Sequence, residues 1–206
     1  MVDFQSRNTR RNDDDDDDAA ERSDDGTAES TPDDEDSTDA HHEDDVSQVG
    51  VAVVTVSSSR SLSDDPAGDA VVAAVEAAGH EVATRELVTD RYDRVQGALD
   101  NLTGRDDVAA VITTGGTGVT PDDVTVDAAR PLFDMELPGF GEEFRRRSAS
   151  DIGTKIIGSR ATGGVVGGTL VFCLPGSEHA ATLGTDEIIL PELAHLAGLA
   201  GHNTDA

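Results

Sequence analysis

The sequence predicts an α/β fold in which helices cover the faces of a parallel sheet. Two observations indicate this fold: apolar, β-branched segments alternate with segments of helical periodicity, and the connections between them are short. Strands buried on both faces appear as continuous apolar runs, and parallel neighbours need a crossover between them, usually a helix.

The first strand is predicted over residues 49–56 (VGVAVVTV), which are almost entirely apolar. A helix follows over residues 66–78, because Val71, Val72 and Val75 fall on one face and Gly79 is placed to end it. The remaining predictions are a strand at 81–88, a helix at 92–102, a strand at 108–113, helices beginning near Thr125 and spanning 140–147, a strand or hairpin at 165–174, and a mostly helical stretch at 177–199.

Charge divides the 206-residue chain into two parts. Residues 1–45 hold 19 of the 43 acidic residues, only 4 of the 15 basic ones and almost nothing apolar, which predicts a disordered acidic N-terminal tail. The aspartate run within it can attract divalent cations, but a solvated tail is the favoured interpretation because no fold fixes a coordination geometry. Residues 46–206 are long enough for one folded domain.

The folded part is also acidic, with 24 acidic residues against 11 basic ones, and Lys155 is the only lysine of the chain. Such a composition is typical of proteins from salt-loving microbes. The negative charge argues against nucleic acid and anionic membranes as partners. No apolar stretch reaches the ~20 residues of a membrane helix, and a single cysteine, Cys173, allows no internal disulfide. We therefore expect a cytoplasmic protein in which Cys173 packs in the core.

Ligands of such sheets bind at the carboxyl ends of the strands, where four loops are candidates: residues 57–68, 88–91, 115–123 and 174–177. The third loop contains Gly115, Gly116, Thr117 and Gly118, and its glycines let backbone N–H groups approach a phosphate. Alternatively, this loop is only a tight strand-to-helix turn.

The adjacent carboxylates Asp122 and Asp123 have two interpretations of equal weight: they cap the following helix, or one of them holds Mg²⁺. Asp90 ends the second strand and is expected at the same edge of the sheet. The first loop adds further acids, Asp64, Asp65 and Asp69, so the carboxylates can converge on a Mg-nucleotide site, although each alone is more typical of a cap or a surface charge. Ser177 is expected to cap a helix, and the histidines lack the spacing of a zinc site.

Several separate motifs together resemble the molybdopterin-binding MoaB/MogA family of molybdenum cofactor biosynthesis. They are VAVVTVSSSR, AAGHEV, TTGGTG-x-T-P-x-D-V-T, RPLFDMELPGFGEEFR, SRATGG and GTLVFCLPGS, in that order from about Val49 to Leu199. The resemblance implies a three-layer α/β/α sandwich with a mostly parallel central sheet, so that residues 46–206 form a MoaB/MogA-like domain.

The resemblance also implies an activity: a terminal phosphate oxygen of molybdopterin attacks the α-phosphorus of ATP, with Mg²⁺ as cofactor. The implied catalytic and metal-binding residues are Asp90 and Asp123. The implied substrate-binding residues are Gly115, Gly116, Thr117, Gly118, Ser159, Arg160, Pro175, Gly176 and Ser177. Homotrimers or homohexamers, with a molybdate-insertion protein as a further partner, are typical of the family.

Two departures from the family pattern lie in the loops. Asp122 stands where many members carry arginine, and DDPAG at residues 64–68 stands where D-T-S-G is usual. Two alternatives to adenylyl transfer stay open. One is a non-catalytic molybdopterin carrier, and the other is a nucleotide pyrophosphohydrolase similar to the CinA proteins, although those usually have GGLGPT where this chain has GGTGVT.

Overall fold

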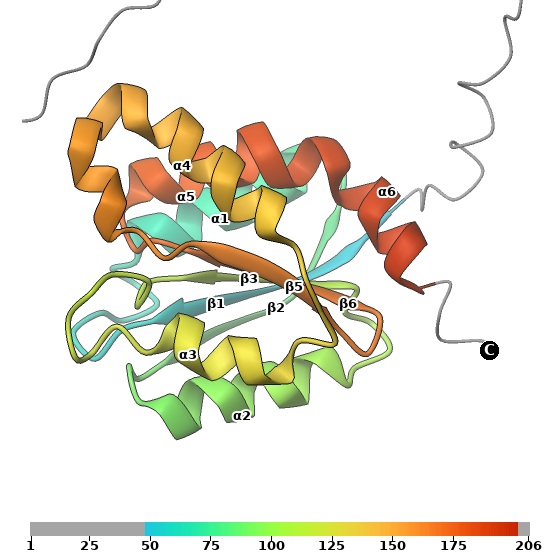
Figure 1. Cartoon of the computed structure of the whole chain (residues 1–206). Coiled ribbons are helices and arrows are strands. Elements are labelled where there is room, and N and C mark those ends of the chain that lie inside the picture. The colour runs from blue at the N-terminus through green and yellow to red at the C-terminus, as the bar shows by residue number, and fades with distance from the viewer. Residues whose placement is uncertain (1–47, 202–206) are drawn as a thin grey trace, which may run out of the picture. The chain divides into compact units, whose positions relative to one another are not determined.

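A six-stranded mixed sheet runs through the part of the chain that the structure, a computed structural model, describes, residues 48–201 (Figure 1). The strand order is β2 (Glu81–Val88), β1 (Gly50–Val56), β3 (Ala110–Thr114), β6 (Thr169–Leu174), β5 (Thr162–Val166) and β4 (Met135–Glu136). The first four strands in this order are parallel, and β5 and β4 are antiparallel to their neighbours. The prediction of a mostly parallel sheet is confirmed.

Helices cover both faces of the sheet. One layer contains α1 (Pro66–Ala77), α4 (Pro138–Ile152), α5 (Glu178–Gly184) and α6 (Leu190–Gly201), and the other contains α2 (Tyr92–Thr103) and α3 (Thr125–Ala129) (Figure 1). Short 3-10 segments follow α3 (Arg130–Leu132) and α4 (Gly153–Gly158), and a π-helical turn (Thr185–Ile189) joins α5 to α6. The three-layer α/β/α sandwich is therefore present.

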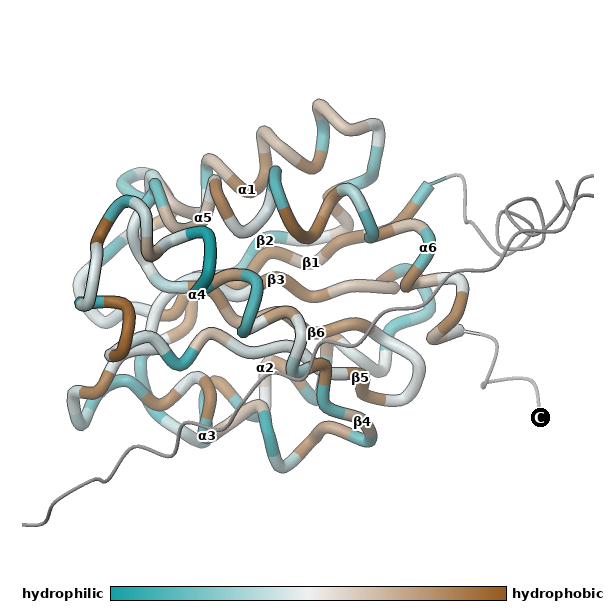
Figure 2. Tube along the Cα trace, turned by 45° about the horizontal axis from the view of Figure 1, so that its top comes forward, coloured by the Kyte–Doolittle hydropathy of each residue, from teal (hydrophilic) through white to brown (hydrophobic). Residues whose placement is uncertain are grey.

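The core is divided by the sheet into two apolar clusters. On β1, Val51 and Val53 pack toward the layer of α1, while Ala52 and Val54 pack toward α2 and α3. All four side chains are buried, which explains why the strand is apolar throughout instead of alternating. Hydrophobic residues are accordingly concentrated along the central strands in Figure 2.

Most predicted elements are confirmed, some to the residue. The strand β2 has its predicted bounds, and α1 begins at Pro66 and ends before Gly79, whose φ is 84°. The segment predicted as a strand or hairpin is a hairpin, β5–β6, which turns at Gly167 and Gly168 with φ of 54° and 88°. Helix α4 extends five residues beyond its predicted end, and the two-residue strand β4 was not predicted.

The four parallel strands end level with one another at the carboxyl edge of the sheet. Thr55 of β1 is in register with Thr114 of β3, and Thr114 is in register with Leu174 of β6. The loops that follow these strands therefore begin side by side, at the edge where open parallel α/β sheets bind ligands.

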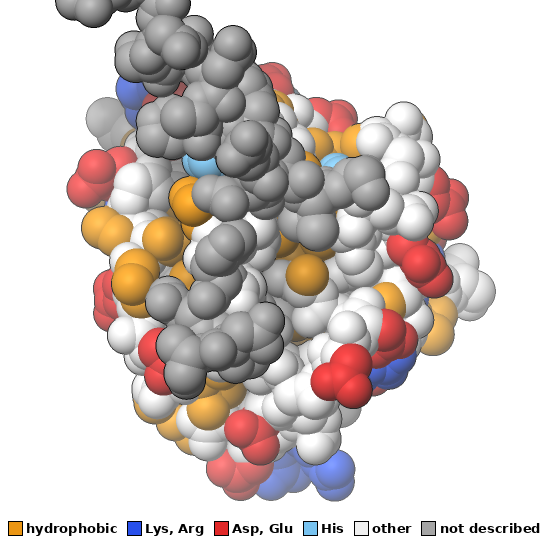
Figure 3. Space-filling view, turned by 90° about the vertical axis from the view of Figure 1, so that its right-hand side faces the viewer, with side chains coloured by type: hydrophobic (Ala, Val, Ile, Leu, Met, Phe, Trp, Pro, Cys, Tyr) orange, Lys and Arg blue, Asp and Glu red, His pale blue; other side chains and the backbone are white. Residues whose placement is uncertain are grey.

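The predicted tail, residues 1–45, lies outside the described residues. Within residues 48–201 the chain carries 23 acidic residues against 11 basic ones, and acidic side chains are spread over the face seen in Figure 3. No helix in this part of the chain has the length and apolar character needed to cross a membrane. Cys173 is fully buried, and burial raises the pKa of its thiol to about 11, so the prediction of a packed core thiol is confirmed.

Candidate active site

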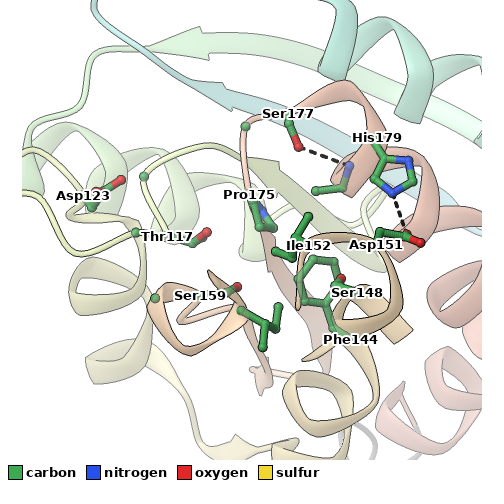
Figure 4. Close-up of a pocket in the computed structure, with 16 residues that line it drawn as sticks. Thr117, Asp123, Phe144, Ser148, Asp151, Ile152, Ser159, Pro175, Ser177 and His179 are labelled. Atoms are coloured by element: carbon green, nitrogen blue, oxygen red, sulfur yellow. Dashed lines mark hydrogen bonds and ion pairs between the residues drawn. The ribbon is translucent and has the colours of Figure 1, made fainter. Parts of the chain in front are cut away.

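A cavity of about 330 Å³ opens at the carboxyl edge of the sheet (Figure 4). Two of its walls come from the glycine loop after β3 and the turn after β6, and the others come from α4, from the 3-10 segment after it and from the start of α5. Of the predicted site residues, those that line the cavity are Gly116, Thr117, Gly118, Asp123, Ser159, Pro175, Gly176 and Ser177. The structure thus brings together the loops at 115–123 and 174–177 and the segment at 159.

The glycine loop needs glycine at two consecutive positions. Gly115 and Gly116 have φ of 98° and 68°, where side chains other than glycine are strained. A Cβ on Gly115 would collide with the carbonyl oxygen of Val56, and a Cβ on Gly116 would collide with Oγ1 of Thr125. Gly115 is buried and does not line the cavity itself, so it shapes the loop from behind.

Thr125, the first residue of α3, locks this loop in place and was not predicted as a site residue. Its buried hydroxyl donates to the carbonyl oxygen of Gly115 over 2.8 Å, and its backbone N–H donates to the carbonyl oxygen of Gly116 over 3.0 Å. The threonine of the T-P-x-D-V-T motif therefore serves the loop through two hydrogen bonds that sequence periodicity does not reveal.

The turn after β6 packs directly on the glycine loop. The backbone N–H of Gly115 donates to the carbonyl oxygen of Leu174 over 2.9 Å, and a Cβ on Gly176 would lie 3.1 Å from Cα of Gly115. Ser177 accepts a hydrogen bond from the backbone N–H of Ala180 over 3.2 Å, so the prediction of a helix cap at α5 is confirmed. Glycine at 176 allows the two backbones to meet at the floor of the site.

Asp123 is held in its loop as an anion beside the cavity. Its Oδ2 accepts hydrogen bonds from the backbone N–H and the hydroxyl of Thr120, over 2.8 and 2.7 Å. Burial raises the pKa of this carboxyl, but these bonds, a backbone bond from Gly118 and the charge of Arg160 outweigh it, so the pKa lies below its ordinary value of 3.8.

The alternative in which these aspartates cap α3 is wrong. Val124 occupies the cap position and makes no side-chain capping bond. Asp123 instead binds within the turn before the helix, and Asp122 is exposed and lines no part of the cavity. Asp123 can close its own turn in this way because it lies only three positions after Thr120.

Arg160 lies behind the glycine loop, outside the cavity wall. Its Nε donates to the carbonyl oxygen of Gly118 over 2.7 Å, a second nitrogen donates to that of Asp123, and Nη1 pairs with the carboxylate of Asp127 over 2.9 Å. Its backbone N–H also donates to the carbonyl oxygen of Thr117 over 2.9 Å. In this structure its guanidinium therefore stabilises the loop, a use that the sequence did not predict.

Asp90 follows β2 at the predicted edge but does not line the cavity. It is half-buried, and its Oδ1 accepts a hydrogen bond from the hydroxyl of Ser58 in the first loop. The structure thus links Asp90 to the loop at 57–60 and leaves it outside the group of residues that surround the cavity.

The acids of the first loop do not converge on the cavity either. Asp65 is fully buried at the start of α1, where its carboxylate accepts hydrogen bonds from Thr55, Gly68, Arg60 and Arg85. Such a saturated carboxylate has no lone pair directed at a ligand. Ala67, which stands where the family has a hydroxyl, is also buried in the core, so that departure does not reach the cavity wall.

Several lining residues of α4 and the segment after it were not predicted as site residues: Phe144 lies within the predicted helix, and the others lie beyond its predicted end. Phe144 and Ser148 of α4 are buried beside the cavity, and Ile152 and Ile156 complete an apolar wall opposite the polar loops. Phe140, Phe144 and Ser148 recur every four residues, and this spacing is the signal that could have identified the face.

A further missed pair lies at the rim of the cavity, where His179 of α5 contacts Asp151 of α4. His179 Nε2 and Asp151 Oδ2 are 2.8 Å apart, and both side chains line the opening (Figure 4). The contact joins two walls of the cavity that are distant in sequence.

The carboxylates at the cavity can hold a divalent cation only if a bound ligand supplies further oxygen atoms for its coordination. Within residues 48–201, no three or more histidine, cysteine, aspartate or glutamate side chains are grouped so as to hold a metal. Mg²⁺ commonly takes one or two protein carboxylates together with substrate phosphate oxygens and water. The ionised Asp123 at the cavity wall fits such a site, whereas Asp65 does not.

Comparison with known proteins agrees with this architecture. A protein-family model described as "Probable molybdopterin binding domain" matches residues 52–195. The chain is 45% identical over 150 residues to molybdenum cofactor biosynthesis protein B of Bacillus subtilis (strain 168), a match that covers 70% of this chain and 85% of that protein.

Solved structures show the same similarity. A crystal structure of a molybdenum cofactor biosynthesis protein B superposes with a TM-score of 0.73 at 38% identity, covering 75% of this chain and 97% of that one. The tungsten cofactor synthesizing protein MoaB from Pyrococcus furiosus gives a TM-score of 0.68 at 33% identity, covering 76% of this chain and 99% of that one.

Proposed function

The chain belongs to the molybdopterin-binding, MoaB/MogA-like family of molybdenum cofactor biosynthesis, and on this premise we propose that it binds molybdopterin and adenylylates it with Mg-ATP. In the proposed reaction a terminal phosphate oxygen of molybdopterin attacks the α-phosphorus of ATP. The bond from that phosphorus to the bridging β-phosphate oxygen breaks, and pyrophosphate leaves with the electron pair.

The observation that carries the proposal is the meeting of two glycine turns and one ionised carboxylate at a single cavity. Gly116, Gly118 and Gly176 line the cavity, and in such glycine turns backbone N–H groups can bind phosphate oxygens. Such transfer depends mainly on positioning and charge stabilisation, which a preformed loop supplies without reorganisation.

The two sides of the cavity suit different parts of the substrates. Phe144, Ile152 and Ile156 offer an apolar wall to a planar ring system, and the polar turns on the other side offer donors to phosphates. Ser177 and Ser159 add hydroxyls to that polar side. The arrangement therefore supports binding of an organic phosphate that places its ring against the apolar wall and its phosphate groups against the polar turns.

Mg²⁺ is part of the proposal and would supply charge neutralisation between carboxylate and phosphates. Asp123 is the residue expected to hold it, with Asp90 as the second carboxylate predicted from the family. Because Asp90 contacts Ser58 and does not line the cavity, its part in metal binding is the less supported of the two.

The proposal is tested by incubating the full chain with molybdopterin, ATP and Mg²⁺ in concentrated KCl. Release of pyrophosphate together with adenylylated pterin is the expected result. Pterin binding without pyrophosphate release would show a carrier, and hydrolysis of a nucleotide in the absence of pterin would show a pyrophosphohydrolase. A homotrimer or homohexamer is the proposed assembly, which light scattering after size-exclusion chromatography measures.

A further inference from the structure

Arg60 connects a buried carboxylate to the wall of the cavity. Its Nη1 donates to Oδ1 of Asp65 over 3.3 Å, and its Nη2 donates to the carbonyl oxygen of Gly176 over 3.0 Å. Gly176 lines the cavity, whereas Arg60 does not. One planar guanidinium thus spans the gap between the core and the turn after β6.

The carboxylate at the inner end of this connection is firmly anchored. Besides the bond from Arg60, Asp65 accepts a bond of 2.5 Å from the hydroxyl of Thr55 on β1, one of 3.1 Å from the backbone of Gly68 and one of 2.9 Å from Arg85 on β2. Its side chain is fully buried. Charge-assisted hydrogen bonds are strong, and a buried carboxylate has no water to bind in their place. The position of the Asp65 carboxylate is therefore fixed.

The loop that carries Arg60 is itself held from both sides. The hydroxyl oxygen of Ser57 accepts the backbone N–H groups of Ser59 and Arg60, each over 3.2 Å, and the N–H of Ser57 donates to the carbonyl oxygen of Val88 over 2.9 Å. Ser58 donates to Asp90. The guanidinium therefore projects from a preformed turn and not from a free segment.

The outer end of the connection has little freedom to move. Gly176 packs so closely on Gly115 that a Cβ there would lie 3.1 Å from its Cα, and Gly115 is bonded to Leu174. A displacement of the turn at 174–177 is thus transmitted to the glycine loop. Arg60 contacts this turn through its hydrogen bond to the carbonyl oxygen of Gly176.

We propose that Arg60 is a positioning residue, which fixes the turn at 174–177 against the glycine loop by bridging Asp65 and Gly176. Its effect on activity rests on the proposed function, whereas its effect on the mobility of the turn does not. Two bonds at fixed separation require the fork of arginine, which the single ammonium of lysine does not reproduce. The inference also gives Asp90, which does not line the cavity, a structural connection to it through Ser58 and the same loop.

The test compares Arg60→Gln, Arg60→Lys and a matched control, Arg105→Gln, in the full chain. Arg105 also forms a bidentate pair, with Asp107 over 2.8 and 2.6 Å, but it is exposed and precedes β3 at the opposite edge of the sheet. The measurements are kcat and KM for ATP, thermal unfolding, and amide hydrogen exchange of peptides covering residues 174–177 and 66–77.

Arg60→Gln is expected to lower kcat/KM by about tenfold to 100-fold, the cost of a small misplacement of reacting groups. Exchange at 174–177 is expected to accelerate while that of α1 is unchanged. Arg60→Lys should recover only part of the activity, and Arg105→Gln should match the unsubstituted chain.

Full recovery by Arg60→Lys would overturn the inference, because charge alone would then suffice. It would also be overturned if Arg60→Gln lowered the unfolding temperature with kcat/KM unchanged. If the unsubstituted chain shows no turnover, the proposed function fails and hydrogen exchange alone decides: unchanged exchange at 174–177 in Arg60→Gln would then refute the positioning role. If Arg60→Gln does not fold, Arg60→Lys, which keeps a cation beside Asp65, is used instead to measure both kcat/KM and hydrogen exchange at 174–177.

Discussion

The charge of Asp123 and the hydrogen bonds that it accepts from Thr120 can be separated by one substitution. Asparagine keeps an acceptor oxygen for Thr120 but removes the negative charge beside the cavity. We expect Asp123→Asn to retain the fold and to lower kcat of the proposed reaction by about 10²-fold or more, as expected for loss of a preorganised electrostatic group. Pyrophosphate release and thermal unfolding measure the two effects.

Asp122→Asn is the matched control for that substitution. The neighbouring carboxylate is exposed and does not line the cavity, so its neutralisation should leave kcat unchanged. If Asp123→Asn also kept its rate, the assignment of Asp123 would be refuted. A loss of activity in Asp122→Asn would instead show that the acid standing where many relatives have arginine takes part in the reaction.

At the scale of elements, the glycine loop and α3 depend on each other through Gly116 and Thr125. Gly116→Ala would place a methyl group against Oγ1 of Thr125 at a backbone with φ of 68°. We expect it to reduce the free energy of unfolding by about 1–3 kcal/mol, from strain and overpacking together. Denaturant unfolding monitored by circular dichroism measures the change.

Gly97→Ala provides the contrast within a helix. Gly97 lies in α2, and a Cβ there would meet nothing within 4 Å. Alanine is favoured over glycine in a helix interior by about 1 kcal/mol, so this variant should be more stable than the original chain. Equal effects of the two substitutions would show that the conformation of the loop imposes no strain.

The start of α1 predicts how stability depends on pH. Burial raises the pKa of the Asp65 carboxyl, but bonds from Thr55, Arg85 and Gly68 and the charge of Arg85 outweigh it, so the folded pKa lies below the ordinary value of 3.8. A lowered folded pKa stabilises the protein fully above the unfolded pKa, and this contribution is lost as the pH falls through the folded value.

The free energy of unfolding should therefore fall steeply once the pH drops below about 4, which a series of urea titrations between pH 6 and 3 measures. Asp65→Asn should be less stable at neutral pH and should show a shallower acid dependence. An identical slope in the variant would assign the acid sensitivity to other carboxylates, such as Glu143, whose bonds from Arg146 and Arg147 and their charges lower its pKa to about 2.

For the whole molecule, net charge predicts a dependence on salt. Between residues 48 and 201 acidic side chains outnumber basic ones, so their negative charges repel one another in the folded state. Raising the ionic strength from 0.1 to 1 M shortens the Debye screening length from about 10 to about 3 Å. The unfolding temperature is expected to rise with KCl. Replacing the exposed acids Glu76, Asp106 and Glu192 by their amides should weaken that rise, and an unchanged slope would contradict an electrostatic origin.

The acidic leader provides a second prediction at this scale. Residues 1–45 hold almost nothing apolar and none of the predicted site residues, so removing them should leave kcat and KM unchanged. The same pyrophosphate assay checks this result. Lost activity after the deletion would give the leader a part in the reaction.

The α/β class, most element positions, the family and the loops that meet at the cavity can all be read from the amino-acid sequence. These features are local: strand burial appears as apolar runs, helix ends appear as proline and glycine, and the glycine loop has a distinctive motif. Thus β2 and the starts of α1 and α2 were predicted to the residue, and eight of the predicted site residues line the cavity.

Which polar groups face the cavity and which support it depends instead on contacts between segments that are distant in the sequence. Arg160 and Asp65 carry the charges that a ligand site needs, yet their partners are protein atoms up to 42 residues away in sequence. Arg60 and Gly176 are separated by 116 residues and meet within 3.0 Å. A hydrogen bond depends on position and direction in space, and sequence spacing fixes these only within one element, so the residues that position the site emerge only when the strands are laid side by side.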